Sequence, residues 1–516
     1  MYASVFLDKV TEVNDTVNTF VWVTLGLALL IGTGILMTLL NKFFQVSHFG
    51  HWMKETVGKL FTKKVAGHTK DRSSISQFQA LCTALAATVG VGNIAGVAAA
   101  IVAGGAGAIF WMWVAAFFGM MTNFSENVLG IFYRRKVNGE WAGGAMYYLK
   151  DGLGSKKGCK WIGRVLAVLF ACFAVLASFG IGNMGQVNKI VANLESAFDI
   201  PALSSVTLYD GVSLYSVVIG GVLLLLAGLI ILGGMQRIAK VAEKIVPVMI
   251  VLFIVGSLVI IGVHFDRIGA AFGAIFGSAF SGKAVWGGAV GVTLRQVITW
   301  GFKRGVFSNE AGLGSSVMVH SCSNVKEPVR QGMWGVFEVF TDTMVICTMT
   351  ALVILTGGLV DLETGILAEG LTDSTLVSAT FGNVFGKAGE MFVAIAILLF
   401  AFTTVLGWSQ YGSKAVEYLG GKRAKQAYQV FFVLLIMSGA LMTSSLAWDI
   451  SDTFNGLMMI PNLIGVIVLS GQVRKITQNY IDRKLKHKDV APLLSYDARI
   501  QKQMEDELAA EEAAAQ

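Results

Sequence analysis

Long apolar stretches separated by short polar segments dominate the chain. Eleven of them are long enough to cross a bilayer as helices, which takes about 20 residues. They fall near residues 20–41, 77–106, 107–133, 161–193, 213–233, 245–264, 284–302, 331–357, 389–411, 428–447 and 453–472. Only 14% of the residues are charged, well below the roughly 25% usual in globular proteins. The pattern predicts an all-α polytopic membrane protein with eleven transmembrane helices.

Lysine and arginine gather between alternate spans. If the N-terminus lies outside, 34 of the 40 Lys and Arg residues fall in cytoplasmic segments. Because positive residues are retained on the cytoplasmic side of a membrane, we expect an outside N-terminus and a cytoplasmic C-terminus. The net charge of +7 then reflects topology within a lipid bilayer, and no nucleic-acid partner is expected.

The residues that carry enzyme chemistry form no recognisable constellation. The five cysteines are scattered without CxxC spacing, and the six histidines include no HExxH motif. An integral membrane enzyme is therefore the weaker alternative to a transport protein, and we expect no enzyme activity. A passive channel is a further alternative, which differs from a transporter in that it accumulates nothing against a gradient.

The stretch at 77–106 contains a polar break, Thr88-Val89-Gly90-Val91-Gly92-Asn93. Each glycine costs about 1 kcal/mol relative to alanine in a helix interior, so the motif disfavours a continuous helix. Opened backbone is tolerated in a membrane only where it is buried in protein or lines a polar cavity. The break predicts a binding site, with close helix packing at small residues as the alternative.

Setting the first span aside leaves ten, which divide into two sets of five. An odd number of spans per set places the second set in the opposite orientation, as in an inverted repeat. The leading span of each set carries a Val-Gly-Val interruption, at 89–91 and at 290–292. We therefore expect one peripheral N-terminal helix and a five-plus-five inverted repeat with discontinuous first helices. The expected domains are 1–76 (peripheral helix and cytoplasmic segment), 77–264 and 265–475 (the two repeats), and 476–516 (cytoplasmic tail).

Four long motifs resemble the alanine or glycine:cation symporter family of bacteria and archaea. They are the runs 87–98 (ATVGVGNIAGVA), 103–113 (AGGAGAIFWMW), 143–148 (GGAMYY) and 304–315 (RGVFSNEAGLGS). The resemblance covers roughly residues 20–475. It implies a leucine-transporter-like fold, co-transported sodium, uptake of small neutral amino acids by alternating access, and a place in the bacterial inner membrane.

The resemblance also implies a substrate site at the two breaks. Within the wider fold, the run 90–93 (GVGN) resembles the Gly-x-Gly-Asn motif of sodium:neurotransmitter symporters. By that resemblance, Thr88 and Asn93 would face the substrate, and the amides of Val91 and Gly92 would receive its carboxylate. Gln186 would contact the amine, with a helix-to-helix hydrogen bond as the alternative. No charged residue stands at the break, so uncharged oxygens must meet the amine. The implied substrate residues are Thr88, Gly90, Val91, Gly92, Asn93, Gln186, Val290, Gly291, Val292 and Thr293.

A sodium site is implied where the span at 389–411 crosses the first break. Adjacent hydroxyls at Thr403 and Thr404 would bind the ion, and oxygen ligands suit a hard cation. The alternative is that these threonines only bond back to their own helix. The implied sodium ligands are the carbonyls of Ala86, Val89 and Phe400 and the hydroxyls of Thr403 and Thr404.

A few ionisable residues fall within or beside the spans. Glu338 and Asp342 are four apart and share a helix face, with Arg295 late in the preceding span. We expect an ion pair or a water-facing gate, with a proton path as the alternative. Glu310 at the cytoplasmic mouth is expected either in a gate network or in a solvated loop.

The aromatic and basic segment 43–62 resembles an amphipathic helix on the inner leaflet.

Overall fold

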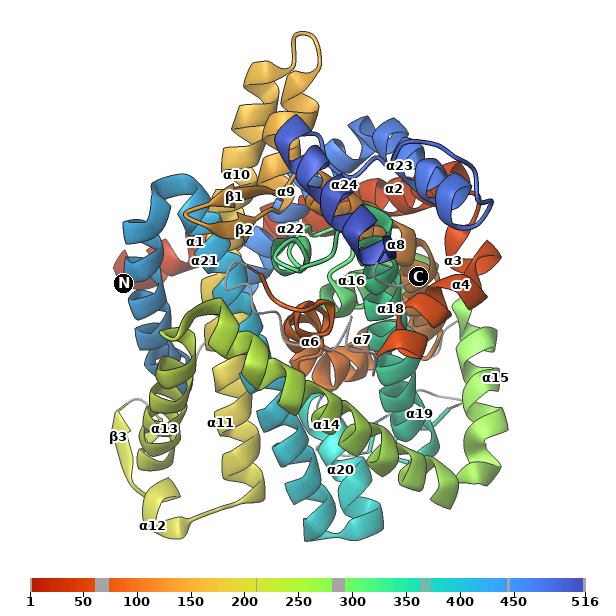
Figure 1. The fold of residues 1–516 in the computed structure, drawn as a ribbon. Helices are drawn as coiled ribbons and strands as arrows, with labels where there is room; N and C mark the ends of the chain where they lie inside the picture. Colours follow the sequence, from red (N-terminus) through yellow and green to blue (C-terminus); the bar gives the residue numbers. More distant parts are fainter. Residues whose placement is uncertain are drawn as a thin grey trace.

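The computed structural model is a bundle of helices with two short β-hairpins (Figure 1). It describes residues 2–60, 74–209, 211–280, 293–362, 367–368, 371, 373–442 and 446–513. Within these ranges eight helices are long and apolar enough to cross a membrane: Asp8–Leu40, Gly107–Phe132, Lys160–Ala197, Leu214–Ile231, Gly234–Val263, Pro328–Thr356, Lys387–Ala440 and Asp449–Val468. The expectation of a mostly helical chain with several membrane-length helices is confirmed.

The membrane-length helices are built from fourteen α and π segments, several joined end to end. Those of the first half are α1 (Tyr2–Thr19), η1 (Phe20–Leu25), α2 (Gly26–Leu40), α8 (Gly107–Phe132), α10 (Lys160–Phe179), η6 (Gly180–Met184), α11 (Gly185–Ala197), α13 (Leu214–Ile231) and α14 (Gly234–Val263). Those of the second half are α18 (Pro328–Val339), η8 (Phe340–Cys347), α19 (Thr348–Thr356), α21 (Lys387–Ala440) and α22 (Leu446–Val468).

Helix α21 covers two of the spans that the sequence predicts. It runs for 54 residues, but Gly421 has φ 73° and ψ −167°. Because a positive φ of this kind interrupts a helix and is readily adopted only by glycine, α21 is two helices joined by a kink. The predicted span at 77–106 is divided between α6 (Gln77–Thr88) and α7 (Ala95–Gly104), and the predicted span at 284–302 is described only from residue 293. The count of eleven spans therefore stays a prediction.

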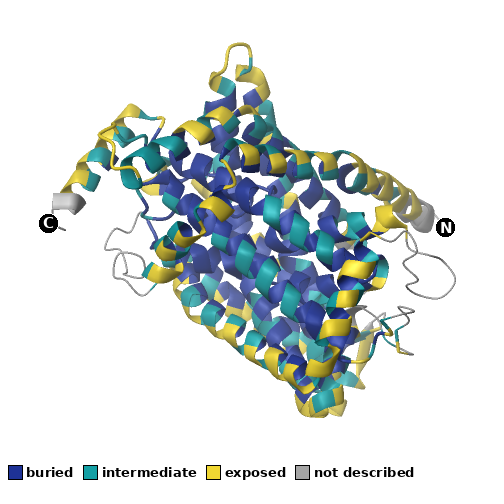
Figure 2. Cartoon of the chain, turned by 90° about the vertical axis from the view of Figure 1, so that its right-hand side faces the viewer, coloured by how far each residue is buried: buried dark blue, intermediate teal, exposed yellow. Residues whose placement is uncertain are grey.

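Apolar side chains cover much of the outer surface of α13 and α14. Leu225 and Leu229 are 65% and 68% exposed, and Val251 is 60% exposed. Buried residues fill the middle of the bundle, while exposed ones lie on its outer surface (Figure 2). Exposed apolar area on this scale is unusual for a protein in water, and it suits helices that face lipid.

The first predicted break is present between α6 (Gln77–Thr88) and α7 (Ala95–Gly104). A capping box starts α6, in which the Gln79 amide donates to Ser76 Oγ at 3.1 Å and the Gln79 side chain accepts from the Ser76 amide. Gly90 then adopts an extended conformation, and a 3-10 turn, η3 (Val91–Asn93), leads into α7. The glycine spacing therefore interrupts the helix where the sequence predicts it.

The second predicted break lies largely outside the described residues. Val290, Gly291 and Val292 fall in the range that is not described. The described part begins at Thr293, which is exposed and caps α16 (Leu294–Asn309) by accepting from the Gln296 amide at 3.3 Å. Thr293 is therefore the one described residue of the predicted second break.

Segment 43–62 packs against the protein rather than forming one surface helix. It contains two short helices, α3 (Phe44–Ser47) and α4 (Phe49–Glu55), and the turn η2 (Val57–Lys59). Phe44 and Trp52 are fully buried, and Phe44 stacks beside Phe124 of α8 with ring centroids 5.0 Å apart. The expectation of a helix lying on the leaflet is thus corrected, because two of its aromatic side chains fill the core.

The remaining described elements are short, peripheral or close to the chain ends. They are β1 (Arg135–Val137), β2 (Glu140–Ala142), α9 (Ala145–Tyr147), η4 (Tyr148–Gly152), η5 (Leu153–Ser155), α12 (Pro201–Ser204), β3 (Thr207–Tyr209), β4 (Val212–Ser213), η7 (Phe265–Arg267), α15 (Ile268–Ala279), α17 (Val317–His320), α20 (Asp373–Phe385), α23 (Ser470–Lys484) and α24 (Ala498–Ala513). Each hairpin is antiparallel, β1 with β2 and β3 with β4.

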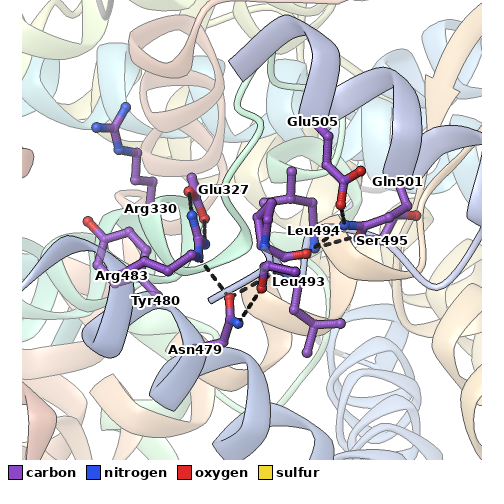
Figure 3. Close-up of polar contacts among 12 residues, drawn as sticks. Glu327, Arg330, Asn479, Tyr480, Arg483, Leu493, Leu494, Ser495, Gln501 and Glu505 are labelled. Atoms are coloured by element: carbon purple, nitrogen blue, oxygen red, sulfur yellow. Dashed lines mark hydrogen bonds and ion pairs between the residues drawn. The ribbon is translucent and has the colours of Figure 1, made fainter. Parts of the chain in front are cut away.

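The C-terminal segment folds back onto one end of the bundle, near β1 and β2 (Figure 1). Arg483 donates from both terminal guanidinium nitrogens to Glu327 at 2.8 Å, and Asn479 accepts from the Leu493 amide at 3.1 Å (Figure 3). Leu494 and Met504 pack with Trp141 in a small buried cluster. These contacts define the C-terminal clamp, which comprises α23, α24 and the segment between them.

Candidate functional site

Two side chains hold the opened backbone at the break in α6. The Gly90 amide donates to Asn93 Oδ1 at 2.9 Å, and the Val91 amide donates to Gln186 Oε1 at 3.4 Å. Gln186 comes from α11, whose packing against α21 brings it beside the break. The two amides are thus satisfied within the protein, as buried backbone groups must be. Gln186 lies at the break, and its expected contact with the substrate amine stays a prediction.

Thr404 of α21 lies directly opposite Gly90. A Cβ built on Gly90 would come within 2.5 Å of Thr404 Oγ1 and 3.4 Å of Gln186 Oε1. One turn further along α21, a Cβ on Gly407 would meet Ala87 at 2.6 Å. Glycine at these two positions therefore lets α6 and α21 approach closely, which places the Thr404 hydroxyl against the break.

The other expected sodium ligands lie around this crossing. The Phe400 carbonyl accepts from the hydroxyls of both Thr403 and Thr404 at 3.0 Å. Thr403 also contacts Met249 Sδ of α14 at 3.4 Å, so its hydroxyl is turned toward a different helix from that of Thr404. Ala86 and Val89 are fully buried at the end of α6. Of the expected sodium ligands, Thr404 is the one that the structure places against Gly90, and the shared sodium site stays a prediction.

A small cavity of about 20 Å³ lies at the crossing. Five residues expected at the substrate or sodium site line it, namely Thr88, Gly90, Gly92, Gln186 and Thr404. A volume of this size holds about one water molecule. An amino acid is larger than this, so it can bind here only if the surrounding side chains or helices move apart.

Asn93 faces a polar network rather than this cavity. Its Nδ2 donates to Asp342 Oδ1 at 2.6 Å, and its carbonyl accepts from Thr350 Oγ1 at 2.8 Å. Asp342 Oδ2 accepts from Ser308 Oγ at 2.7 Å and from Thr343 Oγ1 at 2.8 Å. Asp342 thus connects the break to α16 and η8, and it anchors the side chain that caps Gly90.

The expected ion pair of Arg295 with Glu338 and Asp342 is wrong, while the water-facing gate and the proton path stay predictions. Arg295 is exposed near the start of α16, whereas Glu338 and Asp342 are fully buried. Glu338 Oε2 instead lies 3.0 Å from His320 Nε2 and accepts from Asn123 Nδ2 at 3.4 Å. The two acidic groups share a helix, as their spacing predicts, but each has its own set of partners.

Glu310 is the residue at this site that the motif analysis left unassigned. It follows the last residue of α16, is only 3% exposed, and lines the cavity together with Phe307 and Trp408. A solvated loop at Glu310 is therefore excluded. Its place in the run 304–315 was the available signal, because that motif is long and contains a single acidic residue.

Thr293 does not join these residues at the cavity. Its hydroxyl belongs to the exposed cap of α16 and donates to Gln296 Oε1 at 3.0 Å. Because Val290, Gly291 and Val292 lie outside the described range, the expected contribution of the second break stays a prediction. The described part of the site is formed by α6, η3, α11, α16 and α21.

The chain is similar to known proteins over nearly its whole length. The model of the sodium:alanine symporter family matches residues 7–492. The chain is 44% identical to the sodium/alanine symporter AgcS of Methanococcus maripaludis, over 92% of this chain and 98% of that protein. It is 36% identical to the probable sodium/glutamine symporter GlnT of Bacillus subtilis, over 92% of this chain and 91% of that one.

The fold is similar to that of MhsT, whose crystal structure was determined in complex with L-phenylalanine. The TM-score is 0.52 at 12% identity, covering 78% of this chain and 98% of MhsT. This likeness supports a leucine-transporter-like fold. The family and its relatives are transporters rather than enzymes. With the broken helix and a match over nearly its whole length, the chain belongs to the sodium:alanine symporter family.

Proposed function

We propose that this protein couples the entry of sodium to uptake of alanine, glycine or a similar small neutral amino acid. The observation that carries the proposal is the opened backbone at Gly90, set against the Thr404 hydroxyl in a small polar cavity. The names of the relatives support sodium as the coupling ion and include both alanine and glutamine as cargo.

The sodium ion is assigned to the crossing of α6 and α21. Its ligands are the carbonyls of Ala86, Val89 and Phe400 with the hydroxyls of Thr403 and Thr404. The amino acid binds beside it at Thr88, Gly90 to Asn93 and Gln186, and reaches the second break at 290–293. In taking the amide of Val91, its carboxylate replaces the contact that Gln186 Oε1 makes there at 3.4 Å.

Transport proceeds by alternating access around this cavity. Sodium and the amino acid both stabilise the arrangement in which the break is closed, so binding of one raises the affinity for the other. The two sets of five helices, 77–264 and 265–475, move relative to each other to open either side. The distribution of Lys and Arg supports an outside N-terminus and a cytoplasmic C-terminus in a bacterial inner membrane.

The purified protein in liposomes tests this proposal. Radiolabelled alanine should accumulate against its gradient when sodium is outside, and not when choline replaces sodium. Unlabelled glycine and glutamine in a competition panel then rank the substrates. Uptake without accumulation would indicate a passive channel, and no uptake of any amino acid would contradict the proposal.

The substitution Gly90→Ala tests whether the break takes part in transport. The added methyl group would lie 2.5 Å from Thr404 Oγ1, so it displaces the hydroxyl or separates the helices. We expect sodium-driven uptake to fall more than tenfold. Gly96→Ala in α7 is the control, because a Cβ there meets nothing within 4 Å. Equal uptake by Gly90→Ala and Gly96→Ala would show that the break does not take part in transport.

A further inference from the structure

The hydroxyl groups of the cavity present acceptor oxygens rather than free donors. Thr88 Oγ1 donates its hydrogen to the Ala84 carbonyl at 3.3 Å, and Thr404 Oγ1 donates to the Phe400 carbonyl at 3.0 Å. A hydroxyl has a single hydrogen and two lone pairs. Each of these oxygens therefore keeps lone pairs for a further partner, and that partner must be a donor or a cation.

The amide groups of Gln186 and Gly90 at the cavity also donate their hydrogens within the protein. Gln186 Nε2 donates to the Ile181 carbonyl at 2.9 Å, which turns the side-chain oxygen toward the Val91 amide. The Gly90 amide is already taken by Asn93. An incoming anion would have to displace these bonds, whereas an incoming cation would meet oxygen lone pairs that are already oriented.

Two helix C-termini meet at the same cavity. Thr88 is the last residue of α6, and Glu310 directly follows the last residue of α16. Both residues line the cavity. A helix C-terminus carries about half a negative charge from its aligned peptide dipoles. The ends of α6 and α16 therefore contribute a field of the same sign as the side-chain oxygens. The start of η3 at Gly90 has the opposite sign, but the amides of Gly90 and Val91 there already donate to Asn93 and Gln186.

Glu310 adds a carboxyl group to the cavity. Ser315 Oγ donates to its Oε2 at 2.5 Å, and the uncharged side chains of Trp408 and Tyr411 lie beside it. In the described part of the chain, no Lys, Arg or His nitrogen forms an ion pair with it within 4.0 Å. A buried carboxylate of this kind is costly unless an opposite charge compensates it. The cavity therefore favours a positive ligand.

We propose that Glu310 is a binding residue for a monovalent cation, supplying a carboxyl oxygen to the otherwise uncharged oxygens of Thr88, Thr404 and Gln186. The cation is either the sodium ion or the ammonium group of the amino acid, so the inference rests on the proposed function and refines it. It also revises the expectation that uncharged oxygens alone meet the amine. Glu310 joins the site because the chain turns back at the end of α16.

The test compares Glu310→Gln with Glu126→Gln. Both residues are buried carboxyl groups that accept hydrogen bonds from neutral donors, but Glu126 does not line the cavity. Thermal unfolding of each purified protein is measured in choline chloride, after replacement by sodium chloride, and after addition of L-alanine. The half-saturating concentrations of sodium and alanine for uptake are measured in parallel in liposomes.

We expect Glu310→Gln to raise one half-saturating concentration at least tenfold and to abolish the matching rise in melting temperature, while Glu126→Gln keeps both responses. Loss of the sodium response assigns Glu310 to the ion, and loss of the alanine response assigns it to the ammonium group. If both are lost in a protein that still unfolds cooperatively in choline, the shared cation role is supported. Glu310→Asp provides the same measurement with the charge retained if Glu310→Gln does not fold.

Wild-type affinities and both thermal responses in Glu310→Gln would overturn the inference, even where the wild-type protein shows sodium-driven uptake. Conversely, a wild-type protein that is stabilised by sodium through Glu310 but transports nothing would keep the cation site and contradict the proposed function. The two claims can therefore fail separately.

Discussion

The central site and the C-terminal clamp both contain buried carboxylates, but they satisfy them differently. In the clamp, Glu327 is 2% exposed and receives two nitrogens of Arg483 at 2.8 Å (Figure 3). At the centre, Glu310 and Asp342 are equally buried and accept bonds from hydroxyl, amide and indole groups. A permanent arginine fixes the charge of Glu327, whereas neutral donors leave the central oxygens able to respond to a ligand.

The two kinds of carboxylate suit different roles: the pair at the clamp stabilises the fold, and the carboxylates at the centre suit transport. A bidentate arginine pair is strong and specific in geometry, so it suits a contact that stays closed. A carboxylate whose positive partner is a transported cation is paired when the cation is bound and unpaired after it leaves. Its contribution to stability can therefore differ between the states of a transporter. Changes at the centre should therefore alter transport, while changes in the clamp should alter stability and leave substrate affinity unchanged.

Asp342→Asn should produce the largest effect among the changes that test this contrast. Asp342 accepts from Asn93, Ser308 and Thr343 with its two oxygens. The asparagine amide would replace one acceptor by a donor that faces other donors, and a buried unsatisfied group costs about 1–3 kcal/mol. We expect sodium-driven uptake to fall more than tenfold because Asn93 no longer holds the break.

Asp489→Asn is the control for that change, because Asp489 is exposed in the segment after α23. It should transport at the wild-type rate. Wild-type uptake by Asp342→Asn, measured at equal protein in the liposomes, would show that the network around Asn93 is only structural packing.

Arg483→Ala should have an intermediate effect, confined to stability. Removing the guanidinium leaves Glu327 buried without its partner, at a cost of roughly 3 kcal/mol. We expect a lower melting temperature in detergent and unchanged half-saturating concentrations of sodium and alanine. The double change Glu327→Gln with Arg483→Ala should lose less than Arg483→Ala alone, because no charge is then left unpaired. A changed sodium affinity in Arg483→Ala would link the clamp to the site.

The sequence predicts the first break well because its cause is local. Two glycines two residues apart weaken the helix wherever they stand, and the resemblance to known symporters supplies Thr404 as the partner across the break. Both expectations concern residues whose neighbours in the chain already suggest their role. Gly90 and Thr404 can approach closely because the glycines at the crossing, Gly90 and Gly407, have no side chain.

The burial of Glu310 could not be predicted in the same way. It follows Lys303 and Arg304 in a segment whose composition resembles a solvated loop. The turn after it is buried because groups remote in sequence satisfy its backbone: Asn462 Nδ2 donates to the Gly312 carbonyl at 2.8 Å, and the Gly312 amide donates to Glu126 at 3.4 Å. Only the tertiary packing of α8 and α22 brings these partners together.

Lys486→Ala should have the smallest effect, although it lies in the same clamp as Arg483. Lys486 and Lys488 both pair with Asp482, at 3.2 Å and 3.4 Å, and both lysine side chains are more than half exposed. Exposed pairs gain little because water screens the charges and the long side chains lose freedom. We expect no measurable shift in the melting temperature, even though Arg483→Ala, three residues away, lowers it clearly. A drop as large as that of Arg483→Ala would show that net positive charge, rather than the buried pair with Glu327, holds the clamp closed; raising the salt concentration would then destabilise the wild-type protein as well.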